Sequence, residues 1–283
     1  MHTSTSPQYA IIASCDVAAA MMEPPGGTAL VEESIQESLD FRRAMRKVDK
    51  EFGRDWWFKV WGPDKLAPEG VGTAADWVLK AGDKWHGFGD LAEGFNLLDP
   101  IKSTIITPGL DVTGKFAKTG IPAAIVTKYL AEHGIVVEKT GLYSFFIMFT
   151  IGITKGRWNT LLTSLQQFKD DFDRNQPMWR VLPEFCAAHP RYERVGLRDL
   201  CQSIHEMYAR GDIARLVTEM YLSDVQPALK PSDAFACIAQ QRTQRVGIDD
   251  LEGRITTSML TPYPPGIPLL IPGERFKIGR AHV

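Results

Sequence analysis

One acidic side chain stands apart in this sequence, because Glu138 ends the apolar run of residues 135–137 and is followed directly by Lys139. A carboxylate in such a place can bind the cationic group of a ligand, since an ammonium removed from water needs a counter-charge. The same residues also fit a solvated turn in which Glu138 pairs with Lys139. Residue types alone favour the solvated turn.

A second chemical candidate is the start of the chain, where four hydroxyl residues, at positions 3–6, precede Pro7. We expect a helix from about Gln8 to Met22. Hydroxyls and free amides at a helix start can bind an anion such as phosphate. They also serve as simple helix caps, and residue types alone favour that interpretation.

The cysteines and histidines form no recognisable metal or nucleophile motif. The four cysteines include no pair at CxxC distance, and the six histidines include no HExxH-like spacing. We therefore expect no metal site, and buried, reduced thiols. His86 is more simply a packed structural residue than a base. Lys102 and Lys155 are better explained as surface cations near strand ends than as Schiff-base lysines.

The elements that position Glu138 lie between Thr119 and Lys169. Pro122 suits the first turn of a helix, and Gly134 suits the residue just after its end. Both predicted strands of this stretch are too apolar to be solvated on either face, which indicates the middle of an α/β layer. The stretch predicts a helix, a strand, a turn, a strand and a helix, at residues 123–131, 135–137, 139–141, 143–151 and from 155 onwards.

The remaining elements are predicted from periodicity and from the position of proline and glycine. Helices are expected at residues 30–52, 178–187, 197–209, 213–222 and 232–241, and strands at 56–61, 103–107, 246–248, 254–260 and 268–271. In the helix of residues 30–52, the predicted buried stripe is Ile35, Leu39, Phe41, Met45 and Val48. Its predicted solvated face is Arg42, Arg43, Arg46, Lys47 and Lys50.

Composition excludes several classes of function. With 283 residues, of which 44% are hydrophobic, the chain can form one or two domains with a sizeable core. A formal net charge of −2 gives no electrostatic reason to expect nucleic acid or an anionic membrane as partner. No run approaches the roughly 18 apolar residues of a transmembrane helix, and the N-terminus lacks a basic-then-apolar signal. We expect a cytoplasmic protein.

Five segments resemble the bacterial ornithine/lysine/arginine decarboxylases, which are pyridoxal-phosphate (PLP) enzymes of fold type I. In order, they are HTSTSPQYAIIAS (2–14), WHGF (85–88), LDPIKSTIITPG (98–109), GIPAAIVTKYLAEHGIVVEKTGLYSFFIMFTIGITKG (120–156) and TPYPPGIPLLIPGE (261–274). The resemblance covers only the C-terminal part of such an enzyme.

The resemblance assigns roles to four residues. Ser4 and Thr5 belong to a segment that lies at the family's dimer interface and reaches the PLP phosphate of the partner subunit. Glu138 corresponds to an acid that borders the active site, and Tyr263 should lie close to the substrate entrance. Arginine-preferring members tend to differ around Glu138. The resemblance therefore implies lysine as substrate first, ornithine second and arginine last.

The chemistry of the family also needs parts that this sequence lacks. PLP decarboxylation requires a lysine for the Schiff base and an acid on the pyridine nitrogen. In the family that lysine follows a histidine, and no His-Lys pair occurs here. We expect both residues upstream of Met1, so the chain would contain no catalytic residue. It would be a fragment that is inactive alone, from an enzyme that is a homodimer or a larger homo-oligomer.

The expected fold is α/β (α+β), with a small α/β domain followed by a mostly helical, truncated C-terminal domain. Residues 1–22 would end the PLP-binding large domain, 23–176 would form the small domain and 177–276 the C-terminal domain. Residues 277–283 can be encoded by a stretch that reads like a short-read sequencing adapter, so we expect a non-native tail. An alternative function remains open: a non-catalytic regulatory or interaction module derived from a decarboxylase.

Overall fold

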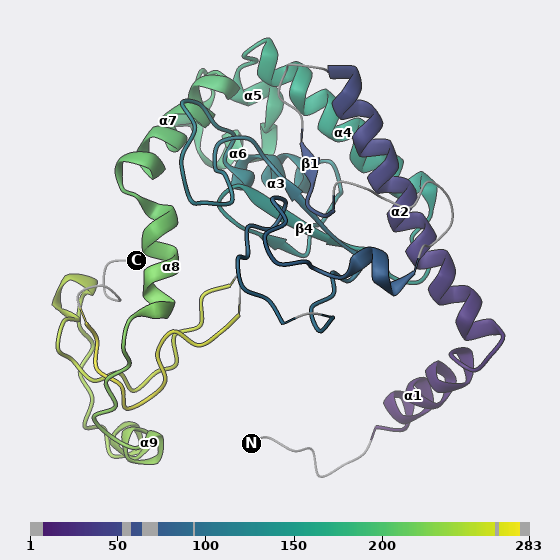
Figure 1. The fold of residues 1–283 in the computed structure, drawn as a ribbon. Helices are drawn as coiled ribbons and strands as arrows, with labels where there is room; N and C mark the ends of the chain where they lie inside the picture. Colours follow the sequence, from purple (N-terminus) through teal and green to yellow (C-terminus); the bar gives the residue numbers. More distant parts are fainter. Residues whose placement is uncertain (1–7, 53–57, 64–72, 93, 264–265, 278–283) are drawn as a thin grey trace. The chain divides into compact units, whose positions relative to one another are not determined.

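The computed structural model describes residues 8–52, 58–63, 73–92, 94–263 and 266–277 (Figure 1). Helices and a small four-stranded sheet confirm the predicted α/β class. The strand order is β1-β2-β4-β3, and β1 pairs antiparallel with β2 in the register Lys59↔Ile106. The α-helices are α1 (Tyr9–Met21), α2 (Gly26–Phe52), α3 (Ala123–Glu132), α4 (Lys155–Asp173), α5 (Met178–Val181), α6 (Pro183–Ala188), α7 (Leu197–Arg210), α8 (Ile213–Leu222) and α9 (Pro231–Ala239). The strands are β1 (Lys59–Val60), β2 (Lys102–Ile106), β3 (Lys139–Thr140) and β4 (Ser144–Met148), and short 3-10 turns occur at Ala74–Trp77, Pro190–Tyr192 and Ile248–Asp250.

The chain divides into two compact units, each assembled from separate segments. The first comprises Met1–Ile106, Leu130–Glu138 and Phe146–Asp171. The second comprises Thr107–Tyr129, Lys139–Phe145 and Phe172–Val283. The domain limits expected from the sequence remain predictions.

The core of the first unit forms where α2 lies beside α4 (Figure 1). The ring of Phe41 on α2 lies 5.5 Å from that of Phe149 and 6.1 Å from that of Trp158 on α4. Trp158 Nε1 also donates a hydrogen bond of 2.5 Å to Glu37 on α2. The predicted buried stripe is confirmed at Leu39, Phe41, Met45 and Val48, whereas Ile35 is half-buried.

Arg42 contradicts its predicted place on the solvated face of α2, because its exposed fraction is only 3%. Its guanidinium donates to the carbonyl oxygens of Trp61 (2.9 Å) and Lys102 (2.7 Å), and it lies 5.6 Å from the ring centroid of Trp77. Burial, assisted by Arg46, lowers the pKa of Arg42 to about 10, so the guanidinium remains charged at neutral pH. The arginine therefore ties α2 to the backbone of β2 and to the residue after β1.

Helix α1 forms as predicted, but none of its residues is buried. Its sequence is nevertheless mostly apolar, and Tyr9, Ile11, Ile12 and Val17 are all more than half exposed. Because α1 buries no face, packing against the described part of the chain contributes little to its stability.

The strand predicted at residues 135–137 is wrong. Gly134 has φ +74°, and the N–H of Ile135 bonds to the carbonyl of Leu130, so these residues close the C-terminus of α3 instead of pairing in a sheet. Val136 is 89% exposed, which also contradicts the expectation that the strand is too apolar to be solvated. The strand of this region is β3, at the residues where a turn was predicted, and β4 covers only part of the predicted 143–151.

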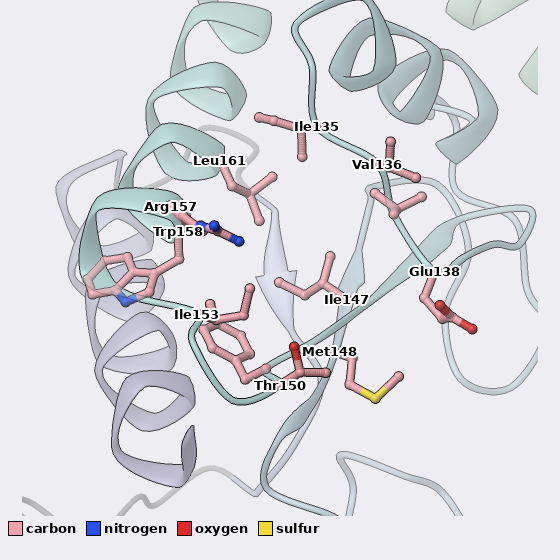
Figure 2. A pocket seen from close by; sticks show the side chains of 12 residues that line it. Ile135, Val136, Glu138, Ile147, Met148, Thr150, Ile153, Arg157, Trp158 and Leu161 are labelled. Atoms are coloured by element: carbon pink, nitrogen blue, oxygen red, sulfur yellow. The ribbon is translucent and has the colours of Figure 1, made fainter. Parts of the chain in front are cut away.

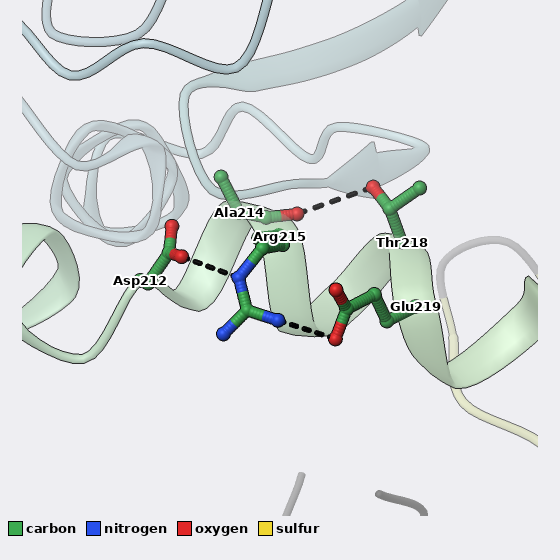
Figure 3. A network of polar contacts seen from close by, with 5 residues as sticks. All are labelled: Asp212, Ala214, Arg215, Thr218 and Glu219. Atoms are coloured by element: carbon green, nitrogen blue, oxygen red, sulfur yellow. Dashed lines mark hydrogen bonds and ion pairs between the residues drawn. The ribbon is translucent and has the colours of Figure 1, made fainter. Parts of the chain in front are cut away.

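In the second unit, the predicted helices are confirmed with small changes. Helix α8 has the predicted bounds, whereas the helix predicted at 178–187 is divided at Leu182 into α5 and α6, because proline occupies position 183. At the start of α8, Arg215 pairs with Asp212 (2.5 Å) and Glu219 (2.5 Å), and all three side chains are about half exposed (Figure 3). Exposed pairs of this kind contribute little stability.

The prediction of regular strands at 246–248, 254–260 and 268–271 is wrong. The described residues there form only isolated bridges, Ile255↔Arg275 and Leu260↔Leu270 among them. Short β-branched runs are locally compatible with a strand, but a ladder also requires a neighbouring partner over several residues.

A loop between β2 and α3 closes on itself within the second unit. Thr107 Oγ1 donates to the carbonyl of Ile121 (2.6 Å), and the N–H of Ala117 bonds to the carbonyl of Gly109 (2.9 Å). A Cβ on Gly109 would lie 2.8 Å from the Cα of Gly120, so the two ends of the loop touch. We refer to residues 109–120 as the closed loop.

Candidate functional site

Glu138 occupies a fixed backbone position with an exposed side chain. Its N–H bonds to the carbonyl of Phe146 (2.8 Å) in the strand β4. The side chain borders a surface cavity of ≈ 300 Å³ (Figure 2). The residues that line this cavity are Ile135, Val136, Val137, Glu138, Ile147, Met148, Phe149, Thr150, Ile153, Arg157, Trp158 and Leu161.

The cavity has mainly apolar walls and two charged residues on opposite sides. In Figure 2 the guanidinium of Arg157 is directed into the cavity, whereas the carboxylate of Glu138 is directed outward at the other side. Arg157 forms no ion pair within the part of the chain that the structure describes. The side chain of Glu138 is exposed to solvent, as both the ligand-binding and the solvated-turn interpretations require.

Tyr263 lies in the second unit and is 62% exposed. The ammonium of Lys139 lies 5.1 Å from the centroid of its ring. Lys139 is the residue that follows Glu138 in the chain, and the common substrate site expected for Glu138 and Tyr263 stays a prediction.

Ser4 and Thr5 lie outside the described residues, and their expected contact with a phosphate stays a prediction. Residues 278–283 also lie outside them, and the non-native origin of the tail likewise stays a prediction.

The two lysines and the histidine considered as catalytic candidates lie in surroundings typical of surface or packed residues. Lys102 pairs with Asp99 at 3.5 Å, and Lys155 is exposed at the start of α4. His86 is 6% exposed, and its Nδ1 accepts a hydrogen bond of 3.0 Å from the N–H of Phe88, so Nε2 carries the proton. Its ring stacks on Phe88 at 5.2 Å, as expected for a packed residue.

Two arrangements were not predicted from the sequence. One is Arg42, described above, and the other joins two buried side chains of the second unit. Tyr143 Oη lies 2.6 Å from His205 Nδ1, and His205 Nε2 lies 2.9 Å from the carbonyl oxygen of Ala117. These residues are far apart in the sequence and carry no local motif, so only the fold brings them together.

The described residues include no group of three or more His, Cys, Asp or Glu that could hold a metal ion. All four cysteines are free; Cys186 and Cys201 are buried as expected, whereas Cys15 is exposed. Among the described helices, none is both long and apolar enough to cross a membrane.

Comparisons with known proteins agree with the resemblance seen in the sequence. Residues 1–157 match the family model described as Orn/Lys/Arg decarboxylase, major domain, and residues 214–282 match its C-terminal domain. The chain is 52% identical to lysine decarboxylase LdcA of Pseudomonas aeruginosa, over 98% of this chain and 37% of that protein. It is 37% identical to the biodegradative arginine decarboxylase of Escherichia coli, over 98% of this chain and 39% of that protein.

The solved structures give the same result. The structure of lysine decarboxylase A from Pseudomonas aeruginosa superposes with a TM-score of 0.92 and 51% identity, over 99% of this chain and 38% of that chain. The chain thus spans less than half the length of the relatives it matches.

Proposed function

Because the chain belongs to the Orn/Lys/Arg decarboxylase family, we propose that it is a piece of a PLP-dependent enzyme that decarboxylates a basic amino acid. Lysine is the favoured substrate, ornithine the second choice and arginine the third. The greater identity to a lysine decarboxylase than to an arginine decarboxylase, 52% against 37%, supports lysine as the first choice; the preference for ornithine over arginine rests on the resemblance around Glu138 alone.

The observation that carries the proposal is the exposed carboxylate of Glu138, fixed at its backbone by the bond to Phe146. A basic amino acid enters its site with a positively charged group at the far end of its side chain. Because the backbone of Glu138 is already held by the bond to β4, only its side chain has to be ordered when the carboxylate pairs with that group, which preserves binding free energy. In this proposal Glu138 binds the distal ammonium, and Tyr263 lies at the substrate entrance.

The described residues do not fit a complete PLP site. Of the two lysines considered as candidates, Lys102 pairs with Asp99 at 3.5 Å and Lys155 is exposed at the start of α4. No lysine follows a histidine anywhere in the chain. We infer that the cofactor-binding lysine and the acid on the pyridine nitrogen belong to a part of the protein beyond these 283 residues, with Ser4 and Thr5 contributing to the phosphate site.

The exposed apolar surface of α1 supports this division of the protein. We infer that residues 1–22 end the cofactor-binding domain, that 23–176 form the small domain, and that 177–276 belong to the C-terminal domain. The full protein would be a cytoplasmic homodimer or a larger homo-oligomer.

A chimera tests the proposal. This chain replaces the matching segment of lysine decarboxylase LdcA, and release of CO2 is measured with lysine, ornithine and arginine. We expect activity that is highest with lysine. The 283-residue chain alone, supplied with PLP, should release no CO2, and borohydride should trap no stoichiometric pyridoxyl-lysine in it.

A correctly folded chimera that acts on none of the three amino acids would contradict the proposal. The regulatory-module alternative predicts the same inactive chimera. It also predicts that the isolated chain binds full-length LdcA, which a pull-down of the two purified proteins detects.

A further inference from the structure

The side chains of Lys139 and Tyr263 form a contact between two distant parts of the second unit. Lys139 Nζ lies 5.1 Å from the centroid of the Tyr263 ring. A cation within about 6 Å of an aromatic face is attracted by the negative charge of that face. The contact joins β3 to the turn that contains Tyr263.

The backbone around Lys139 is firmly held. Thr140 Oγ1, on the same strand, donates a hydrogen bond of 3.2 Å to Thr127 Oγ1 on α3. Directly after the strand, the N–H of Gly141 bonds to the carbonyl of Ser144 at 2.7 Å, which closes a tight turn into β4. The ammonium of Lys139 therefore extends from a fixed base.

The turn around Tyr263 is also closed, but the ring itself is largely open to solvent. The N–H of Gly266 bonds to the carbonyl of Pro262 (2.9 Å), and Gly266 has φ +81°. A Cβ on Gly266 would lie 3.3 Å from Tyr263 Cδ2, so the turn lies against one edge of the ring. Because the ring is 62% exposed, burial does little to fix its orientation.

We propose that Lys139 is a positioning residue that holds Tyr263 beside the entrance of the substrate site. This inference rests on the proposed function, because it gives Tyr263 and Glu138 a common substrate. Lys139 lies on β3, so the strand that begins directly after Glu138 carries the contact with the tyrosine. The proposed role of Lys139 is to orient the ring, not to bind the substrate.

Four substitutions separate the charge of Lys139 from the ring of Tyr263. Lys139→Met keeps an unbranched side chain and removes the cation, whereas Lys139→Arg keeps a cation that can stack on the ring. Tyr263→Phe keeps the ring without its hydroxyl, and Tyr263→Leu removes the ring.

The first measurement needs no activity. The 283-residue chain is labelled with 3-fluorotyrosine, and the fluorine resonance of Tyr263 is identified by its loss in Tyr263→Phe. We expect Lys139→Met to shift this resonance, and Lys139→Arg to leave it close to its original position. A Tyr263 resonance unchanged by Lys139→Met would overturn the contact.

The second measurement uses the LdcA chimera. Loss of an exposed cation–π contact should raise KM for lysine by about two- to fivefold in Lys139→Met, with kcat changed less than about twofold. Lys139→Arg should restore KM. In a Tyr263→Leu background, Lys139→Met should add no further increase, because the two residues act as a pair.

The outcomes distinguish the two proposals. A full increase in KM from Lys139→Met in the Tyr263→Leu background would overturn positioning through Tyr263. A chimera without activity on any basic amino acid would overturn the proposed function and, with it, the substrate role of Lys139. The fluorine measurement would still decide whether the contact exists.

Discussion

The hydroxyl of Tyr143 lies 2.6 Å from His205 Nδ1, and both side chains are at most 4% exposed. The other ring nitrogen, Nε2, lies 2.9 Å from the carbonyl oxygen of Ala117, which can only accept a hydrogen bond. Nε2–H therefore donates to this carbonyl, and Nδ1 accepts a hydrogen bond from the tyrosine hydroxyl. The histidine, bonded at both ring nitrogens, thus joins α7 to the residue before β4 and to the closed loop.

Tyr143→Phe should destabilise the chain, because it removes the donor to Nδ1 and leaves a buried acceptor unsatisfied. The expected loss in the free energy of unfolding is about 1–3 kcal/mol, measured by urea denaturation. Tyr9→Phe is the matched control, since Tyr9 is 82% exposed, and it should change stability by less than about 0.5 kcal/mol. Equal effects of the two substitutions would contradict a buried hydrogen bond.

The same tyrosine should make the free energy of unfolding depend on pH in the alkaline range. Burial, followed by the charges of Tyr208 and Cys201, raises the pKa of Tyr143 well above its ordinary value of 10.0. The folded state therefore retains the phenol proton at a pH where the unfolded chain releases it. This stabilisation is complete below pH 10 and is lost as the pH rises above that value.

We expect the unfolding free energy to fall above about pH 10 more steeply in the unsubstituted chain than in Tyr143→Phe. Urea denaturation at a series of pH values from 8 to 11 measures both slopes. Parallel slopes would show that Tyr143 does not titrate differently in the folded and unfolded states.

Gly120→Ala should also destabilise the second unit. A Cβ at this position would lie 2.3 Å from His205 Nδ1, so the histidine or the closed loop would have to move. Overpacking of this kind costs about 1–3 kcal/mol, which thermal or urea unfolding detects. Gly89→Ala is the matched control, because a Cβ there meets no atom within 4 Å and should cost much less.

The four free thiols should differ in reactivity. Burial raises the pKa of the Cys201 thiol well above its ordinary value, and the thiolate is the reactive form. In the native chain we expect Ellman's reagent to modify exposed Cys15 rapidly, and Cys186 and Cys201 only after unfolding. Cys15→Ser should remove the rapid phase. Rapid modification of Cys201 in folded protein would contradict its burial.

Glu138→Gln tests the substrate role of the acid in the LdcA chimera. The amide keeps the shape of the side chain but removes the charge that we propose to face the distal ammonium. We expect kcat/KM for lysine to fall by roughly 10²-fold, with PLP absorbance unchanged, because loss of one partner of a desolvated pair is costly. Glu33→Gln, at an exposed position of α2, is the control and should stay within about twofold. A change of less than about twofold in kcat/KM for Glu138→Gln as well would contradict the substrate role and support the solvated-turn interpretation.

The sequence predicted helices well where a helix carries its own boundary signals. Helix α8 follows Gly211 and has its predicted bounds, and α3 follows Pro122 and ends before Gly134. The strand predicted at 135–137 failed because β-branched residues also fit the end of a helix. The bond from Ile135 to Leu130 decided between the two, and no local pattern contains that information.

Side-chain surroundings were less predictable than elements. Arg42 belongs to a run of five cations on α2, and nothing in that run distinguishes the one that turns inward toward two backbone carbonyls. Tyr143 and His205 are 62 residues apart, so their bond depends on the packing of α7. Glu138 and Tyr263 were identified by resemblance, whereas the contact of Lys139 with Tyr263 depends on the tertiary fold and has no local sequence signal.

Because Gly109 and Gly120 touch, the closed loop begins and ends at nearly the same point within the second unit. Near Val112, which is 55% exposed, the loop can therefore change without separating these two glycines, whereas Ala117 must stay in place to accept the bond from His205. Changing the length of such a segment costs little, since closure entropy grows only slowly with loop length. The exposed part of the loop at Val112 is thus suited to the insertion of a foreign peptide or an affinity tag.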